Sequence, residues 1–236
     1  MRYRTLLTAA LALLIAACTP PGLAPPPVPA PIAAPAGFPA DGYAQAAAQG
    51  QRVLRVDPAR SRLALTVRRG GTLARLGHDH VVASQALQGY VAPEQGRADL
   101  YLALDSLTVD DPALRAEAGL DTQPSADDIA ATRANMLGKV LQPQQFPFAL
   151  IQARAVPPLA GDAPLAVDIT LHGVTRSFSV PARIAMEGDG LRVQGLLAFD
   201  QSSFGITPFS ILGGALQVQD RVELRFDVHA ARGPVP

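Results

Sequence analysis

Apolar and polar residues alternate along much of this chain, and this period of two constrains its fold more than any other feature. The alternation is clearest in residues 62–68, 99–105, 167–172 and 222–229, where every second side chain is apolar. A strand with one buried face has this pattern, because successive side chains point to opposite faces. Further strand candidates, bounded by glycine, proline or polar residues, are residues 52–56, 81–90, 148–155, 177–186 and 191–199. Gly188-Asp189-Gly190 predicts a hairpin turn between the last two.

One segment departs from the β pattern and predicts a helix near the middle of the chain. Ser125 can cap a helix that begins at Ala126, and Pro143 ends it. Apolar residues between Ile129 and Val140 recur at helical spacing. Residues 41–51, rich in alanine and glutamine, form either a short helix or an extended connection. Many strands with one helical excursion favour an all-β antiparallel fold, and periodicity leaves a closed barrel and a two-sheet sandwich both open.

The N-terminus has the architecture of a bacterial lipoprotein signal. Arg2 and Arg4 precede an apolar run over residues 6–17, which is too short to span a bilayer comfortably, and Cys18 follows as the only cysteine. In such signals the cysteine is lipidated and the preceding segment is removed, so Cys18 is the predicted lipidation site. Thr19, in place of an aspartate, favours the outer membrane, with the protein facing the periplasm. An ordinary secretory peptide is the alternative.

These features divide the chain into three parts. We expect residues 1–17 to be the signal peptide, residues 18–50 a lipid-anchored linker rich in proline and alanine, and residues 51–232 the β domain. Nine prolines between Thr19 and Pro39 exclude a helix or a central strand there. The chain has no second long apolar run, so lipid alone would attach it to the membrane. Its 20 basic and 20 acidic residues provide no basic face for nucleic acid, and the oligomeric state stays open.

Five short motifs carry a resemblance to a known family. They are Val56-Asp57-Pro58-Ala59-Arg60-Ser61, Met136-Leu137 followed by Gln145-Phe146-Pro147, Leu171-His172-Gly173-Val174-Thr175, Phe204-Gly205-Ile206-Thr207-Pro208 and Val218-Gln219-Asp220-Arg221-Val222. In their order and spacing they resemble the YceI-like family of exported, lipocalin-like proteins. The resemblance implies a lipocalin-like eight-stranded antiparallel barrel with one short helical excursion. It also implies an apolar interior that holds a long isoprenoid-type lipid.

The barrel interior is the predicted ligand site. An eight-stranded barrel is just wide enough to be filled by side chains or to hold one small ligand. We predict that apolar residues at inward positions line it, namely Leu63, Leu65, Val67, Phe148, Ile169, Leu171, Phe178, Val180, Phe199, Leu224 and Phe226. The same side chains would also form a solid core, so this alternative stays open.

Residues 76–82, Leu-Gly-His-Asp-His-Val-Val, replace a lysine- and aromatic-rich stretch that is common in the family, and the insertion at 110–127 is long. His78 and His80 are two residues apart, so both imidazoles would project from one face of a strand. Such a pair can ligate zinc or copper, although two ligands are too few for a tight site. The alternatives are a lipid head group bound by the pair or ordinary hydrogen bonds at a polar mouth.

Arg69 and Arg75 flank Gly70-Gly71 and are further head-group candidates, because a guanidinium matches the geometry of a phosphate. Solvated surface charge is the alternative for both. Ser202-Ser203 and Ser210 lack a nearby histidine and the G-x-S-x-G context of a nucleophile, so we expect no enzymatic activity.

The leading interpretation is non-catalytic binding of a long apolar lipid inside a membrane-anchored periplasmic barrel. A polyisoprenoid, a quinone or a similar amphiphile would be the ligand, and we expect no other cofactor. One alternative is a metal-binding or redox-assisting envelope protein that uses His78 and His80. The other is a structural envelope lipoprotein whose barrel is filled.

Overall fold

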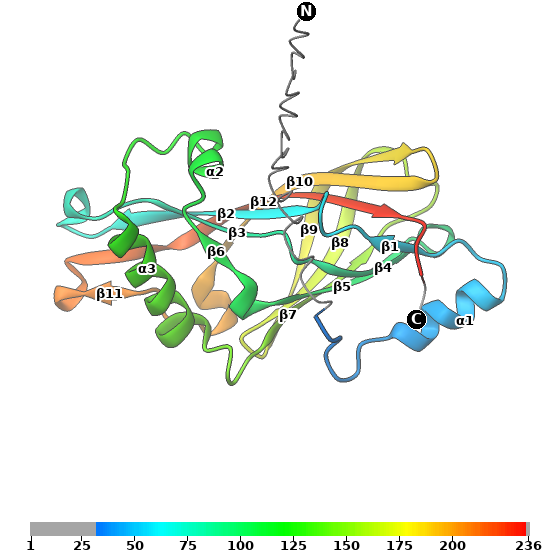
Figure 1. The fold of residues 1–236 in the computed structure, drawn as a ribbon, viewed down its shortest axis with the longest axis horizontal. Helices are drawn as coiled ribbons and strands as arrows, with labels where there is room; N and C mark the ends of the chain where they lie inside the picture. The colour runs from blue at the N-terminus through cyan, green and yellow to red at the C-terminus, as the bar shows by residue number, and fades with distance from the viewer. Residues whose placement is uncertain (1–31, 235–236) are drawn as a thin grey trace, which may run out of the picture. The chain divides into compact units, whose positions relative to one another are not determined.

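A ring of eight antiparallel strands forms the fold in residues 32–234, the part of the chain that this computed structural model describes. The strands, in order around the ring, are β1 (Leu54–Val56), β4 (Gln88–Ala92), β5 (Arg97–Ala103), β7 (Phe148–Arg154), β8 (Gly161–Leu171), β9 (Val174–Glu187), β10 (Gly190–Asp200) and β12 (Leu216–Ala231). β1 pairs with both β4 and β12, so the sheet closes on itself (Figure 1). This confirms the predicted barrel. The predicted signal peptide, Cys18 and the first part of the linker lie outside the described residues.

Four further pairings extend the sheet beyond the ring. β2 (Arg62–Gly70) pairs with β12 and with β3 (His80–Ser84), and β3 pairs with β6 (Thr108–Val109). β11 (Ser210–Ile211) pairs with the first residues of β12. The single strand predicted over residues 81–90 is therefore wrong, because β3 ends at Ser84 and β4 begins at Gln88. The hydroxyl of Ser84 accepts a hydrogen bond from the Ala86 amide at 3.0 Å, which turns the chain between the two strands.

The described residues contain three α-helices: α1 (Ala40–Ala48), α2 (Pro112–Glu117) and α3 (Ala126–Asn135). A π-helical turn, Met136–Leu141, continues α3. Short 3₁₀ turns cover Ala74–Leu76, Pro93–Gln95, Leu104–Ser106, Gln201–Phe204 and Leu212–Gly214. The predicted start of α3 is confirmed, because Ser125 caps it and exchanges hydrogen bonds with Asp128 in a capping box.

α1 packs against the outer face of the sheet, within the range assigned to the linker. The Tyr43 side chain is buried, and its hydroxyl donates to Asp99 Oδ2 at 2.6 Å. Arg97 also donates to Asp99 at 2.6 Å and lies 4.8 Å from the centre of the Tyr43 ring. The short helix considered for residues 41–51 is therefore present, and it belongs to the folded unit that starts at Ile32.

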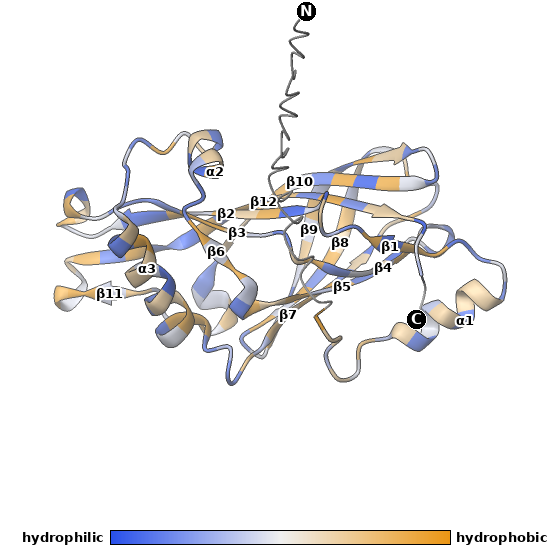
Figure 2. Ribbon diagram, viewed as in Figure 1, coloured by the Kyte–Doolittle hydropathy of each residue, from blue (hydrophilic) through white to orange (hydrophobic). Residues whose placement is uncertain are grey.

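Apolar and polar residues alternate along the strands, as the colours of Figure 2 show. The buried apolar residues form the hydrophobic core of the barrel. On β9, for example, Val180, Ala182 and Ile184 are buried, whereas the residues between them are exposed. The predicted hairpin at Gly188-Asp189-Gly190 is confirmed by the pairing of Glu187 with Gly190. None of the helices in residues 32–234 is long and apolar enough to cross a membrane.

Candidate ligand-binding cavity

The inward faces of β2 and β12 show how the sequence builds an apolar interior. Leu65 lies opposite Leu224 in the register of these two strands, and Leu63 lies opposite Phe226. Both pairs occupy inward positions, because side chains alternate across the sheet. Polar residues at the intervening positions, such as Glu223 on β12, face outward. In these two strands, therefore, every second side chain faces the interior, and the inward side chains are apolar.

The interior holds two adjoining cavities rather than a solid core. One has a volume of about 130 Å³ and the other of about 200 Å³. Four apolar side chains line both cavities and form the boundary between them, namely Leu63, Ile151, Ile169 and Leu224. An apolar cavity of about 150 Å³ stays dry and accepts a molecule the size of benzene. Each cavity is therefore large enough for a small apolar group, and the filled barrel of the third interpretation is not what the structure shows.

The smaller cavity, which we call the closed-end chamber, lies at the end of the barrel where the turn after β4 packs against the segment after β7. Val91, Val180 and Leu191 line it, and all three are buried. At this end the turn after β4 lies against the segment after β7: the Gly96 carbonyl accepts a hydrogen bond from the Ala155 amide at 2.9 Å. Gly96 has a φ of +58°, and a Cβ there would lie 1.9 Å from the Ala155 carbonyl oxygen. Only glycine permits this approach.

The larger cavity, the lid-end chamber, is covered by α3 and the π-helical turn Met136–Leu141, which together we call the lid. Met136, Val140 and Leu141 line the chamber from the lid, with Thr132 and Asn135 beside them. No residue of the lid is fully buried. The lid thus covers this end of the barrel with half-buried side chains. Its π-helical turn is also notable, because π-helical turns frequently occur at functional sites.

Most of the predicted interior residues line these chambers. They are Leu63, Leu65, Val67, Ile169, Leu171, Val180, Phe199, Leu224 and Phe226. Phe178 also faces inward, but it lines neither chamber. Its ring packs against Phe199 and Phe204, with ring centres 6.1 and 6.2 Å apart, and Phe204 is completely buried.

Phe148 was predicted to face the interior, and this prediction is wrong. Its ring makes an edge contact with Tyr101, with ring centres 6.1 Å apart, on the outer side of the barrel. The inward residues of β7 are Ala149, Ile151 and Ala153, which line the chambers. Its hydrophobicity favoured Phe148 as an inward residue. Side chains alternate along β7, however, and the neighbouring Ala149 is the one that faces the interior.

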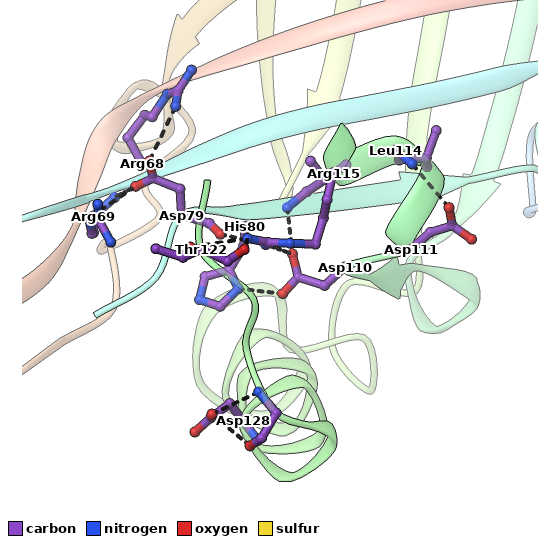
Figure 3. Close-up of polar contacts among 12 residues, drawn as sticks. Arg68, Arg69, Asp79, His80, Asp110, Asp111, Leu114, Arg115, Thr122 and Asp128 are labelled. Carbon is purple, nitrogen blue, oxygen red and sulfur yellow. Dashed lines mark hydrogen bonds and ion pairs between the residues drawn. The ribbon is translucent and has the colours of Figure 1, made fainter. Parts of the chain in front are cut away.

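A buried ionic cluster fixes the segment that leads into the lid (Figure 3). Asp110 lies at its centre, with a fully buried side chain. Its Oδ2 is 2.6 Å from His80 Nδ1, and its Oδ1 accepts from Arg115 at 2.5 Å. Arg115 also donates to the backbone carbonyls of Asp79 and Thr122. The cluster therefore ties α2 and the residues before α3 to β3.

The environment of Asp110 favours its charged form. Burial alone would raise the pKa of this carboxyl, but hydrogen bonds from His80, the Val81 amide and Arg115 outweigh burial and hold the pKa below its usual value. Asp110 has a φ of +58°, a left-handed conformation that aspartate and asparagine adopt more readily than most residues. No local sequence pattern predicts this cluster, because His80 and Asp110 are thirty positions apart; the long insertion at 110–127 is the one feature of the sequence that points to it.

The four predicted head-group residues lie outside both chambers. Arg69 donates to the Gly77 carbonyl at 2.8 Å, and its amide donates to Asp79, which stabilises the loop between β2 and β3. Arg75 is exposed on the 3₁₀ turn of that loop. The rings of His78 and His80 are 6.2 Å apart, and His78 precedes the strand, so the pair does not share one strand face.

The structure does not support the predicted metal site. Among residues 32–234, no group of three or more potential ligands from histidine, cysteine, aspartate and glutamate could hold a metal ion. The Nδ1 atom of His80 is hydrogen-bonded to Asp110. The other histidines that could have completed a site lie elsewhere: His172 packs on Phe146, with ring centres 4.1 Å apart, and His229 pairs with Glu187.

Comparisons with known proteins agree with this architecture. A family model described as a YceI-like domain matches residues 54–230. A polyisoprenoid-binding domain from Saccharophagus degradans, implicated in plant cell wall breakdown, is similar in structure, with a TM-score of 0.56 and 13% identity, over 78% of this chain and 99% of that one. BcnA of Burkholderia cenocepacia has a TM-score of 0.53 and 17% identity, over 75% and 99%. At these identities the likeness shows a shared fold, and no curated protein sequence matches the chain.

Proposed function

The chain belongs to the YceI-like family, and we propose that it binds a long apolar lipid inside its barrel without catalysing a reaction. The observation that carries this proposal is the pair of adjoining apolar chambers along the interior. A chain-like ligand can occupy both chambers, because the side chains between them belong to both linings. A polyisoprenoid or the isoprenoid tail of a quinone has this shape. The polyisoprenoid-binding domain of similar fold is consistent with this ligand class.

The physical gain from such binding is substantial. Each Å² of apolar surface removed from water stabilises a complex by about 25 cal/mol. The inward side chains that line both chambers are almost all apolar, and the polar lining residues lie at the chamber ends, such as Arg97 and Arg154 at strand ends and Thr132 in the lid. A purely apolar tail therefore loses no hydrogen bonds inside, and its polar end would remain outside the chambers.

Lipid extraction tests the proposal directly. The full-length chain is purified from bacterial membranes, extracted with organic solvent and analysed by mass spectrometry. We expect a co-purifying isoprenoid or quinone in the native chain and in Ala166→Phe, which enlarges an exposed residue on the outer face of β8. Ala149→Phe, which fills the lid-end chamber, should lose the lipid. If the native protein carries no lipid and takes up no added isoprenoid, the proposal fails.

We also propose a setting for this binding, in which the mature protein is a lipoprotein anchored through Cys18 and faces the periplasm from the outer membrane. The basic residues, short apolar run and single cysteine at the N-terminus support it. Labelling with radioactive palmitate should modify the native chain and not Cys18→Ser. Fractionation of inner and outer membranes would then locate the labelled protein.

A further inference from the structure

Large apolar side chains gather on the surface at the lid end of the barrel. Leu76 is 61% exposed, Ile211 is 43% exposed and Leu212 is 69% exposed. They belong to two chain segments, the β2–β3 loop and the end of β11 with the β11–β12 loop that follows it, and we call these three residues the apolar tip. The other large exposed apolar residues in the described part of the chain are Val156, Met186 and Leu196, which lie on other elements. Solvent-exposed apolar residues at a common site indicate an interaction surface.

The two loops pack closely against each other, so the residues of the apolar tip are held in fixed positions by direct contacts between the loops. The Leu73 amide donates to the Ala215 carbonyl at 2.8 Å. Gly71 has a φ of +87°, and a Cβ at this position would lie 2.4 Å from the Ala215 carbonyl oxygen. A Cβ on Gly77 would lie 2.9 Å from a methyl group of Leu216. The glycines of the β2–β3 loop therefore allow it to pack directly on the β11–β12 loop.

The charges within the two segments that form the apolar tip are mainly positive. Residues 68–78 contain three arginines and no acidic residue, and residues 201–219 contain no charged residue. Asp79, the last residue of the β2–β3 loop, is acidic, but it pairs with Arg68 and accepts from the Arg69 amide. On the lid, the Asp128 carboxylate accepts hydrogen bonds from Ser125. Arg75 is exposed beside Leu76. Lys139 of the lid is also exposed, and its Nζ lies 5.3 Å from the ring centre of Phe209.

The apolar tip lies next to the lid-end chamber. Phe209, which directly precedes β11, lines that chamber, and so does Val218 near the start of β12. Figure 1 shows β11 and the β2–β3 loop at the same end of the molecule as α3. The apolar lining of the chamber thus continues, through the β11–β12 segment, toward the exposed leucines.

We propose that the apolar tip docks on the surface of an anionic lipid bilayer, with Leu76, Ile211 and Leu212 in the interfacial region. Arg75 and Lys139 would lie against the lipid head groups. Apolar side chains flanked by two exposed cations match the apolar and anionic layers of such a surface. A second copy of the chain fits less well, because its tip would bring cations against cations. This docking would direct the lid-end chamber at the bilayer, and it depends on neither lipidation of Cys18 nor ligand binding.

A site-specific probe separates this docking from attachment by the N-terminal segment. The test uses the full chain with Cys18→Ser, which removes its only cysteine. Leu212→Cys in this background carries a polarity-sensitive fluorophore, and Asp189→Cys is the control. Asp189 lies in the β9–β10 turn, where its side chain is 78% exposed. The pairing of Leu191 with Ala230 places this turn near the end of β12, whereas the apolar tip adjoins its start.

Vesicles of phosphatidylethanolamine with phosphatidylglycerol should shift the emission at position 212 to shorter wavelength, and lipids with a quencher in the acyl chain should quench it. The label at 189 should not respond. Arg75→Gln and Lys139→Gln should each lower vesicle partitioning about fivefold, since one surface cation contributes about 1 kcal/mol on an anionic membrane. Circular dichroism would confirm that each variant is folded.

Three results would overturn the proposal. The first is an unchanged emission at position 212 when vesicles are added. The second is equal partitioning into neutral phosphatidylcholine vesicles. The third is an emission shift that follows protein concentration without vesicles, because this would assign the apolar tip to contacts between copies of the chain.

Discussion

The two ends of the barrel are closed in different ways. At the closed end, Leu54 of β1 is completely buried, and the Gly96 turn packs backbone to backbone against the segment after β7. At the lid end, the cover contributes half-buried side chains, and the ionic cluster around Asp110 fixes the segment leading into it. Local opening occurs where few apolar contacts are buried. From this difference we expect a ligand of the proposed kind to enter and leave at the lid end.

The largest effect should follow from the ionic cluster. Asp110→Asn keeps the size of the side chain and tolerates the left-handed backbone, but leaves the buried Arg115 without its carboxylate. Removing one partner of a buried pair costs about 3–5 kcal/mol, so we expect a loss of this size in the free energy of unfolding, measured by urea denaturation at pH 7. Asp111→Asn at the neighbouring cap of α2 is the control, and it should cost less than about 1 kcal/mol, because asparagine also caps helices. Equal losses would show that the cluster does not stabilise the lid end.

A second pair of substitutions compares packing at the two ends. Leu54→Ala at the closed end should cost about 2–5 kcal/mol, because it leaves a cavity in a fully buried site. Met136→Ala in the half-buried lid should cost about 1 kcal/mol, since it removes less buried surface. Urea denaturation of both variants measures the difference. Comparable losses would contradict the view that the two ends are closed differently.

A third pair fills one chamber at a time. Ala149→Phe places a ring in the lid-end chamber, and Ala153→Phe does the same in the closed-end chamber. If ligands enter at the lid end, the first substitution blocks the way to both chambers, and we expect affinity for a polyprenyl lipid to fall about 100-fold. The second removes only the inner site and should lower affinity about tenfold, or about 1.4 kcal/mol. Lipid titration followed by native mass spectrometry measures both, and the reverse order would identify the opposite end as the entrance.

Sequence reasoning succeeded where a local rule decides the structure. Alternation of apolar and polar residues identifies strands and their faces, and Ser125 carries a local capping signal, so the barrel strands and α3 were predictable. Most of the interior residues followed from the same rule. Phe148 shows its limit, because an error of one residue in the alternation of β7 moves a side chain to the other face.

Tertiary contacts between distant residues could not be derived in this way. Asp110 and His80 are thirty positions apart in the sequence, yet their side chains are hydrogen-bonded. No local pattern predicts that a histidine on a β-strand will pair with a carboxylate from an insertion. The apolar residues of α3 predicted a buried face, but its position over one end of the barrel depends on the packing of the whole sheet. The same applies to α1, since its Tyr43 finds Asp99 on a strand more than fifty residues away.

The smallest effect concerns pH and tests whether the charge of Asp110 holds the lid end. The pKa of Asp110 is lowered in the folded state, so its stabilising contribution is complete above the unfolded value of about 3.9 and is lost as pH falls through the folded value. Other carboxylates with lowered pKa, such as Asp227, add to the acid sensitivity of the native chain. The difference in unfolding free energy between the native chain and Asp110→Asn removes those contributions. This difference should be constant from pH 7 to about pH 5 and shrink below pH 4, by about 1.4 kcal/mol for each unit by which the pKa is lowered. A constant difference over this range would mean that the hydrogen-bonding geometry of Asp110, and not its charge, fixes the lid.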